Sequence, residues 1–261
     1  MNDPHVNSLT YDLATAPTLV FQNPPAIEAQ FSSFRLPLSN GILIVTILQH
    51  FATVPEARQQ VEPILEAWSL DVCLTTGRNE FVFEYRTADM VDRNPTPGHV
   101  LHAAVGEFVV IGETITTTVT RPNYPPVPTE LLITEKVRTM WNRYLRFIDG
   151  KEPILSMAYF CLTLLEQSTE RRFNQRKHAA RRYAVSIELL DAFGKLVSER
   201  GDATQARKYS RDLPRTSLTA SEEAWLSRAV RLIIRRKAEY DKAPGRQFSQ
   251  IGLEQLPPIA W

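Results

Sequence analysis

Four prolines fall within eight residues of the run RPNYPPVP, Arg121–Pro128. Each proline fixes its own φ angle and lacks a backbone N–H, so the run is expected to be extended and cannot continue a helix. The chain has 261 residues, enough for one large domain or two modest ones. We therefore place a boundary between two parts of the chain at residues 122–128.

The charge of the chain changes at the same place. Residues 1–129 hold six Arg, no Lys and thirteen Asp or Glu, a balance of −7. Residues 130–261 hold 24 Lys or Arg and 16 Asp or Glu, a balance of +8, which the overall net charge of +1 conceals. This separation predicts either two surfaces that attract each other or one half that faces an anionic partner.

The N-terminal part has mainly strand patterns. The continuous apolar run Gly41–Leu48 predicts a strand covered on both faces. Helical spacing of Ala57, Val61, Leu65 and Trp68 predicts a helix over 53–70, in which Pro63 implies a kink or a division into two short helices. Further strand-like segments are residues 19–21, 31–36, 70–76, 80–86 and 107–121.

The C-terminal part has helical patterns. Helices are expected over 137–148, 153–168, 171–184 and 187–199, and one more from residue 219. Ser186 is a candidate N-cap, and Thr219–Glu222 has the residue types and spacing of a capping box. The helix over 153–168 is apolar on all sides, which predicts that it is almost entirely buried, with Phe160 and Leu164 in the core.

The predicted fold class is therefore α+β. An acidic, sheet-containing part with one covering helix (1–121) precedes the Pro-rich linker (122–128). A basic, all-helical part (129–243) and an irregular tail (244–261) follow.

The stretch RRFNQRKHAARRYAVS, Arg171–Ser186, concentrates positive charge. Six of its first twelve residues are Arg or Lys, and it contains no acid. On one continuous helix, Phe173, Ala180 and Ala184 would face the core and the cations would cover the remaining directions. The alternatives are a solvated face and a surface that contacts phosphates. The candidate nucleic-acid contacts are Arg171, Arg172, Arg176, Lys177, Arg181 and Arg182.

The run HAARRYAVSIELLDAF, His178–Phe193, resembles a helix–turn–helix of the bacterial repressor kind. The resemblance implies a DNA contact in which the helix over 187–199 enters the major groove. The sequence departs from that pattern in two respects. Ala184 stands at the turn position where Gly is usual, and the second helix opens with Glu188 and Asp191, which face phosphates unfavourably.

Arg172 and His178 resemble the Arg and His pair of HEPN ribonucleases, because five residues separate them. The resemblance implies metal-independent RNA cleavage with His178 as acid/base and Arg172 stabilising phosphate charge. The two side chains would meet only if the helix began late, near Asn174, or across a dimer.

Other classes of function find little support. A phosphate-binding loop, a dinucleotide fingerprint, a nucleophile elbow and paired CxxC motifs are all missing from the sequence. Prolines separate Asp89 and Asp92 from His99 and His102, so we expect no metal site and no cofactor. Cys73 and Cys161 are predicted to be buried free thiols.

The longest apolar helical run, Ile154–Leu165, is too short to span a bilayer. We therefore expect a cytoplasmic protein without membrane contact. The leading hypothesis is a non-enzymatic binding or scaffold protein whose basic half contacts an anionic partner, most plausibly RNA or DNA. The alternatives are the ribonuclease and a structural protein whose oppositely charged halves pair within the chain, with a protein partner or in a homo-oligomer.

Overall fold

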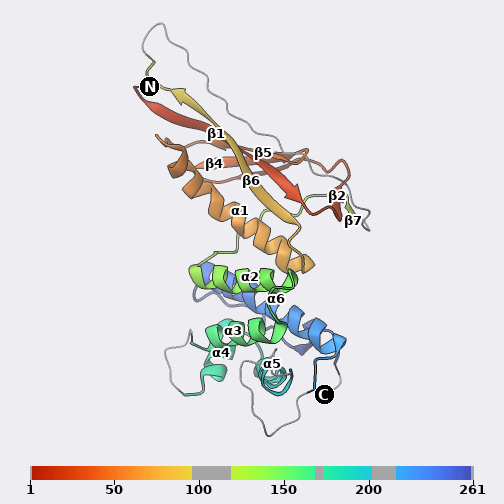
Figure 1. Cartoon of the computed structure of the whole chain (residues 1–261). Coiled ribbons are helices and arrows are strands. Elements are labelled where there is room, and N and C mark those ends of the chain that lie inside the picture. Colours follow the sequence, from red (N-terminus) through yellow and green to blue (C-terminus); the bar gives the residue numbers. More distant parts are fainter. Residues whose placement is uncertain (1, 96–118, 168–172, 202–215, 260–261) are drawn as a thin grey trace. The chain divides into compact units, whose positions relative to one another are not determined.

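A computed structural model describes residues 2–95, 119–167, 173–201 and 216–259 (Figure 1). The chain forms two compact units. One lies within Met1–Cys73 and Asn79–Thr129, and the other within Leu74–Arg78 and Glu130–Trp261. The first holds an antiparallel sheet and most of one helix, and the second holds helices, so the α+β fold class is confirmed.

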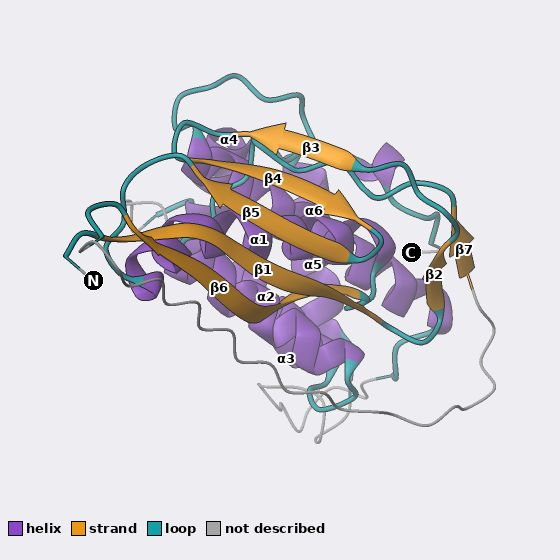
Figure 2. Ribbon diagram, turned by 90° about the horizontal axis from the view of Figure 1, so that it is seen from above, coloured by secondary structure: helices purple, strands orange, loops and turns teal. Residues whose placement is uncertain are grey.

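The sheet unit is built on five antiparallel strands in the order β3-β4-β5-β1-β6 (Figure 2). A separate parallel pair joins β2 to β7. The strands are β1 (Pro4–Thr15), β2 (Leu19–Phe21), β3 (Ile27–Gln30), β4 (Phe34–Ser39), β5 (Ile42–Ile47), β6 (Phe81–Asp92) and β7 (Val119–Arg121). Strand β1 lies between β5 and β6 and pairs with both, with register shifts along the β6 side.

Helix α1 (Val54–Thr76) covers one face of this sheet. Five of its buried residues recur every three or four positions and pack with inward-facing strand residues such as Leu9, Leu36 and Val45. Those helix residues are Ala57, Val61, Leu65, Trp68 and Val72. The predicted apolar stripe of α1 is therefore confirmed, and Val72 extends it by one helical turn beyond Trp68.

Two expectations for this unit are wrong. Residues 70–76, predicted as a strand, are the end of α1, which runs through Pro63 as one helix. The strand β5, predicted to be covered on both faces, alternates instead: Leu43 and Val45 are buried, whereas Ile42 and Ile44 are exposed. Packing against α1 on one face alone accounts for this alternation.

The Pro-rich segment is anchored to the sheet unit. The Tyr124 side chain lies in the same core as Trp68 and accepts a hydrogen bond from the Gly41 N–H at 2.8 Å. The Trp68 indole N–H in turn donates to the Pro125 carbonyl at 3.1 Å. These contacts satisfy polar groups of two buried aromatic side chains and hold the extended segment against α1.

The helical unit contains α2 (Glu135–Ile148), α3 (Ile154–Gln167), α4 (Gln175–Tyr183), α5 (Ile187–Glu199) and α6 (Ala220–Lys242). Helix α6 packs against each of the other four. Its apolar stripe from Trp225 to Ile234 is buried, and a short 3₁₀ turn, η1 (Leu253–Gln255), follows in the tail. The tail is part of the fold, since Ile251 is buried and pairs with Val185.

Helix α3 is less buried than its composition predicts. Residues such as Leu155, Met157 and Cys161 are buried, but Phe160 and Leu164 are only half-buried. The Phe160 ring lies 4.3 Å from the Arg143 guanidinium, which covers it in place of an apolar neighbour. Both cysteines are buried and neither forms a disulfide, as predicted, and burial raises the pKa of Cys161 to about 12.

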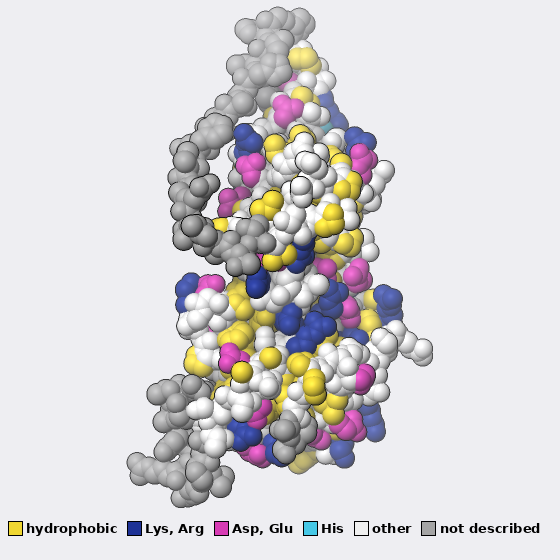
Figure 3. Space-filling model, turned by 90° about the vertical axis from the view of Figure 1, so that its right-hand side faces the viewer, with side chains coloured by type: hydrophobic (Ala, Val, Ile, Leu, Met, Phe, Trp, Pro, Cys, Tyr) yellow, Lys and Arg dark blue, Asp and Glu magenta, His cyan; other side chains and the backbone are white. Residues whose placement is uncertain are grey.

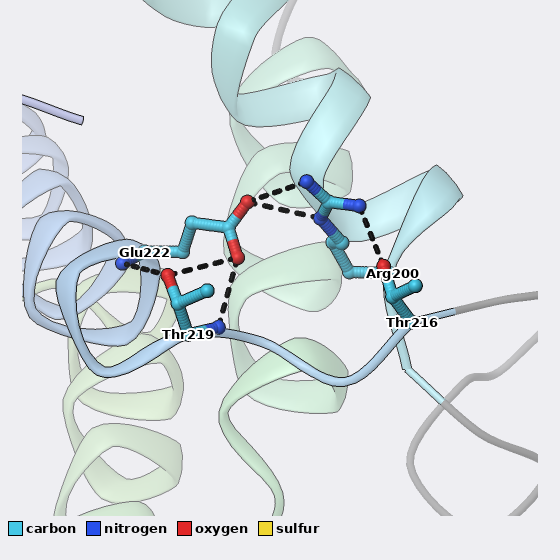
Figure 4. Close-up of polar contacts among 4 residues, drawn as sticks. All are labelled: Arg200, Thr216, Thr219 and Glu222. Atoms are coloured by element: carbon cyan, nitrogen blue, oxygen red, sulfur yellow. Dashed lines mark hydrogen bonds and ion pairs between the residues drawn. The ribbon is translucent and has the colours of Figure 1, made fainter. Parts of the chain in front are cut away.

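Glu222 joins the start of α6 to the end of α5 (Figure 4). The Thr219 hydroxyl and N–H and the Glu222 side chain and N–H form the predicted capping box. The Arg200 guanidinium donates to Glu222 from Nε at 2.9 Å and from Nη2 at 2.8 Å, and also to the Thr216 hydroxyl at 2.6 Å. Burial alone would raise the pKa of Glu222, but hydrogen bonds from Thr219 and Arg200 outweigh it and lower that pKa.

We predict that Glu222→Gln lowers the free energy of unfolding by about 2–3 kcal/mol, because a buried carboxylate loses charge-assisted partners. A carboxylate whose folded pKa is lowered stabilises the protein above its ordinary pKa of 4.5, and that contribution is lost as pH falls through the folded value. The difference between wild type and variant should therefore shrink below pH 4.5, as measured by urea unfolding at several pH values.

The matched control is Lys151→Gln, which breaks the exposed pair with Asp149 and should change stability by less than about 0.5 kcal/mol. An equal loss in both variants, or a difference that persists at low pH, would contradict the role assigned to Glu222.

Candidate anion-binding site

Helix α4 begins later than the sequence analysis predicted. It starts at Gln175, after Asn174 adopts a left-handed conformation with φ 56°. Arg171 and Arg172 fall outside the described residues, so their geometry stays a prediction. The left-handed residue takes Phe173 out of helical register, and this side chain is 83% exposed instead of facing the core. The buried face of α4 consists of Ala179, Ala180 and Tyr183.

Arg176 holds three helices together. Its Nε donates to Glu166 of α3 at 2.8 Å, and its Nη1 donates to Asp191 of α5 at 3.0 Å. Burial alone would lower the pKa of Arg176, but these two carboxylates raise it above its ordinary value. The charge of this guanidinium is therefore already neutralised. Arg176 stabilises the packing of the helices and is a poor candidate for a phosphate contact.

Gly194 makes room for this arrangement. A Cβ atom at Gly194 would lie 2.7 Å from Nη2 and 2.8 Å from Nη1 of Arg176, closer than atoms of this kind approach. The glycine thus lets the guanidinium lie directly on α5, where it reaches Asp191. The sequence gives no local signal for this contact, because the residues come from different helices.

Arg182 and its aromatic neighbours flank the end of α4. The Arg182 guanidinium lies 5.1 Å from the Tyr240 ring of α6, and Tyr240 packs edge-on against Tyr183 at 5.0 Å. Burial alone would lower the pKa of Arg182, but Tyr183, Tyr240 and Asp241 raise it. The side chain remains exposed and carries its charge at the surface.

Lys177 and Arg181 line an open groove of about 590 Å³. Its other lining residues are Ala180, Ala184, Val185, Ile187 and Gln250, and no acid is among them. Neither cation has a hydrogen-bond or ion-pair partner in the described parts of the chain. The spacing of four residues places both side chains on the same side of α4. The groove therefore presents two unneutralised cations above a partly apolar floor.

The floor of this groove is the turn between α4 and α5. Ala184 adopts a left-handed conformation with φ 46°, the geometry for which the turn position usually needs Gly. Ser186 caps α5 as predicted, since its hydroxyl accepts from the Leu189 N–H at 3.1 Å. Gln250, from the tail predicted to be irregular, completes the lining. No local pattern marks Gln250, since only the pairing of Ile251 with Val185 brings it here.

The second helix of this turn is poorly suited to reading bases. Glu188 and Asp191 are both exposed on α5. Exposed carboxylates near the N-terminal end of a recognition helix would face the DNA backbone and repel it. The left-handed turn expected from the helix–turn–helix resemblance is present at Ala184, but the helix that follows it carries exposed acids.

His178 is half-buried on α4. Helix α4 starts late, as an approach of Arg172 to His178 would require, but Arg172 lies outside the described residues, so this pairing stays a prediction. Asp89 and Asp92 lie on β6, where Asp89 accepts from the Asn7 amide, and His99 and His102 fall outside the described residues. Within the described ranges, His, Cys, Asp and Glu residues form no group of three that could hold a metal ion.

Comparisons with known proteins give no match: no family model, no curated protein and no solved structure is similar to this chain at a significant level. The function is therefore argued from the residues of the chain itself. Among the described residues, no helix combines the length and apolar character needed to cross a bilayer.

We predict that Gly194→Ala changes the stability of the wild type little or lowers it by up to about 1 kcal/mol, because the new methyl displaces the flexible end of Arg176 from its two partly exposed carboxylate partners. In an Arg176→Gln background the same substitution should cost nothing or stabilise by up to about 1 kcal/mol, since Ala is the better helix former. Denaturant unfolding of the four proteins measures this coupling. Equal costs in both backgrounds would show that the glycine serves another purpose.

Proposed function

We propose that the helical unit binds nucleic acid through phosphate contacts in the groove of α4, without reading a specific sequence. The observation that carries the proposal is the pair of unneutralised cations, Lys177 and Arg181, in a groove with no acid in its lining. Lys and Arg side chains in such a position release counterions when they contact phosphates, and this release drives sequence-independent binding.

The surroundings of the groove support the same conclusion. Exposed Arg182, outside the groove lining, adds a cation at the end of α4, on the ring of Tyr240. The face of the molecule in Figure 3 shows Lys and Arg side chains over the helical unit, with Asp and Glu side chains among them. In contrast, the exposed acids of α5 disfavour insertion of that helix into a major groove. Contacts would therefore go to the backbone more than to base edges.

The test is a fluorescence-anisotropy titration of labelled single-stranded RNA and duplex DNA at several salt concentrations. Affinity should fall steeply with salt and vary little with sequence. The double variant Lys177→Gln/Arg181→Gln should weaken binding to every sequence alike and reduce the slope of log affinity against log salt by about two.

The matched control is Lys136→Gln/Lys242→Gln, which removes the same charge from exposed positions outside the groove lining. It should leave the slope nearly unchanged. If both double variants lose the same affinity, only the overall charge matters and the groove is not the binding site. If wild type binds neither RNA nor DNA, the proposal is wrong.

A ribonuclease is the second candidate, favoured by one observation. Helix α4 begins at Gln175, and this late start is the one that an approach of Arg172 to His178 would require. An imidazole at this position would serve as the acid/base, and Arg172 would stabilise charge on the phosphate.

For this candidate, we expect His178→Ala to abolish cleavage of single-stranded RNA while leaving its binding unchanged, because the variant removes an acid/base. Lys177→Gln/Arg181→Gln should weaken binding but preserve cleavage at saturating protein. The measurement is gel analysis of labelled RNA alongside the anisotropy titration. RNA that stays intact with wild type, or cleavage that survives in His178→Ala, would exclude this chemistry.

A further inference from the structure

Three arginines form a row on α6, apart from the groove: Arg228, Arg231 and Arg235. Their spacing of three and four residues places them one above the other on one side of the helix. Several other cations of the helical unit have a carboxylate partner, as in the pairs Arg176–Glu166, Arg200–Glu222 and Lys237–Asp241. In the described ranges, no carboxylate forms an ion pair with Arg228 or Arg231.

Part of this row has a structural task. The Arg231 Nη1 donates to the carbonyls of Leu74 and Thr75, both at 3.2 Å, and the Arg235 Nη2 donates to the Thr75 hydroxyl at 3.2 Å. Helix α1 has no basic residue in its own last turn, so these two arginines supply the positive charge that its C-terminal end favours.

The capping contacts do not use all donors of the row. A guanidinium has five N–H donors. The Arg231 Nε is buried without any acceptor, although its Nη1 is bound. A buried donor of a charged group that lacks a partner is costly, and such a group in a folded protein calls for an explanation.

Arg228 has no structural task of this kind. Its side chain is half-buried, and within the described residues it has no hydrogen-bond or ion-pair partner. Burial and the positive charges of Arg231 and Arg235 lower its pKa. The fold thus keeps a third cation next to two others, where repulsion and partial desolvation oppose it.

We propose that Arg228 and Arg231, supported by Arg235, form a binding site for a phosphate group. The free guanidinium of Arg228 supplies the donors, and the neighbouring charges of Arg231 and Arg235 strengthen its attraction for an anion. Guanidinium groups match the oxygens of phosphate in pairs, and a phosphate with nearly two negative charges neutralises such a row better than one carboxylate does. This site is independent of the groove, and it can exist whether or not the groove binds nucleic acid.

The test uses inorganic phosphate as the probe, at constant ionic strength against chloride, by isothermal titration calorimetry and thermal unfolding. Phosphate is also excluded from protein surfaces and stabilises folded proteins in general, so the comparison between variants decides. Wild type should show saturable binding and a rise in Tm. Arg228→Gln should bind about tenfold more weakly or worse. Without phosphate its Tm should equal or exceed that of wild type, because no partner is lost and repulsion is relieved.

Two further variants assign the site. Lys177→Gln/Arg181→Gln should bind phosphate like wild type, because the groove is a separate place. Arg228→Lys, which keeps the charge but loses the paired donors, should bind more weakly than wild type and more tightly than Arg228→Gln. Absence of saturable binding by wild type, or wild-type binding by Arg228→Gln, overturns the proposal.

The phosphate could belong to a small molecule or to a nucleic-acid backbone, and a competition separates these sources. A single-stranded DNA oligonucleotide is added to the groove variant with phosphate bound. Displacement of phosphate assigns the row to the polymer backbone, whereas retention assigns it to free phosphate or a phosphomonoester.

Discussion

The buried guanidinium of Arg236 fixes the turn on which the candidate groove depends. Its Nη1 donates to the carbonyls of Tyr183 at 2.8 Å and Ala184 at 3.0 Å, and its Nη2 donates to the Ser249 carbonyl at 2.9 Å. The carbonyls at the end of α4 receive no hydrogen bond from an N–H of their own helix, and the Arg236 guanidinium supplies the missing donors. Glu239, at 2.9 Å from Nε, balances the charge. One side chain of α6 thus joins the end of α4 to the tail.

Buried charge in the helical unit is therefore of two kinds. Lys237, like Arg236, is almost fully buried and is paired, in its case with Asp241, which also accepts from the Thr134 hydroxyl. Burial lowers the pKa of Lys237, although Asp241 opposes this shift. Breaking such a buried ion pair is costly, but while it is intact the cation needs no ligand from solution to balance its charge. Arg228 differs because it has no ion-pair partner among the described residues, and this difference makes its surroundings a candidate site.

The sequence predicts local features better than tertiary ones. The fold class, the Ser186 cap and the Thr219 capping box follow from short-range patterns, and the structure has all three. The strand predicted over 70–76 failed because β-branched and small residues there suggested an extended chain, whereas Val72 continues the buried stripe of α1. Pro63 is tolerated inside α1 because it lies on the exposed side, where water can reach the carbonyl that lacks a donor.

The candidate site shows the same limit in its chemistry. A count of charges along residues 171–182 treats every cation as equivalent, but pairing across helices separates them. Arg176 is neutralised by Glu166 and Asp191, whereas Lys177, the next residue, is not. Because adjacent helical residues point about 100° apart, one faces the neighbouring helices and the other faces the groove. The packing of the other helices around α4 therefore determines how many of its cations a phosphate can reach. The acids of α5 lower that number further, because Asp191 neutralises Arg176.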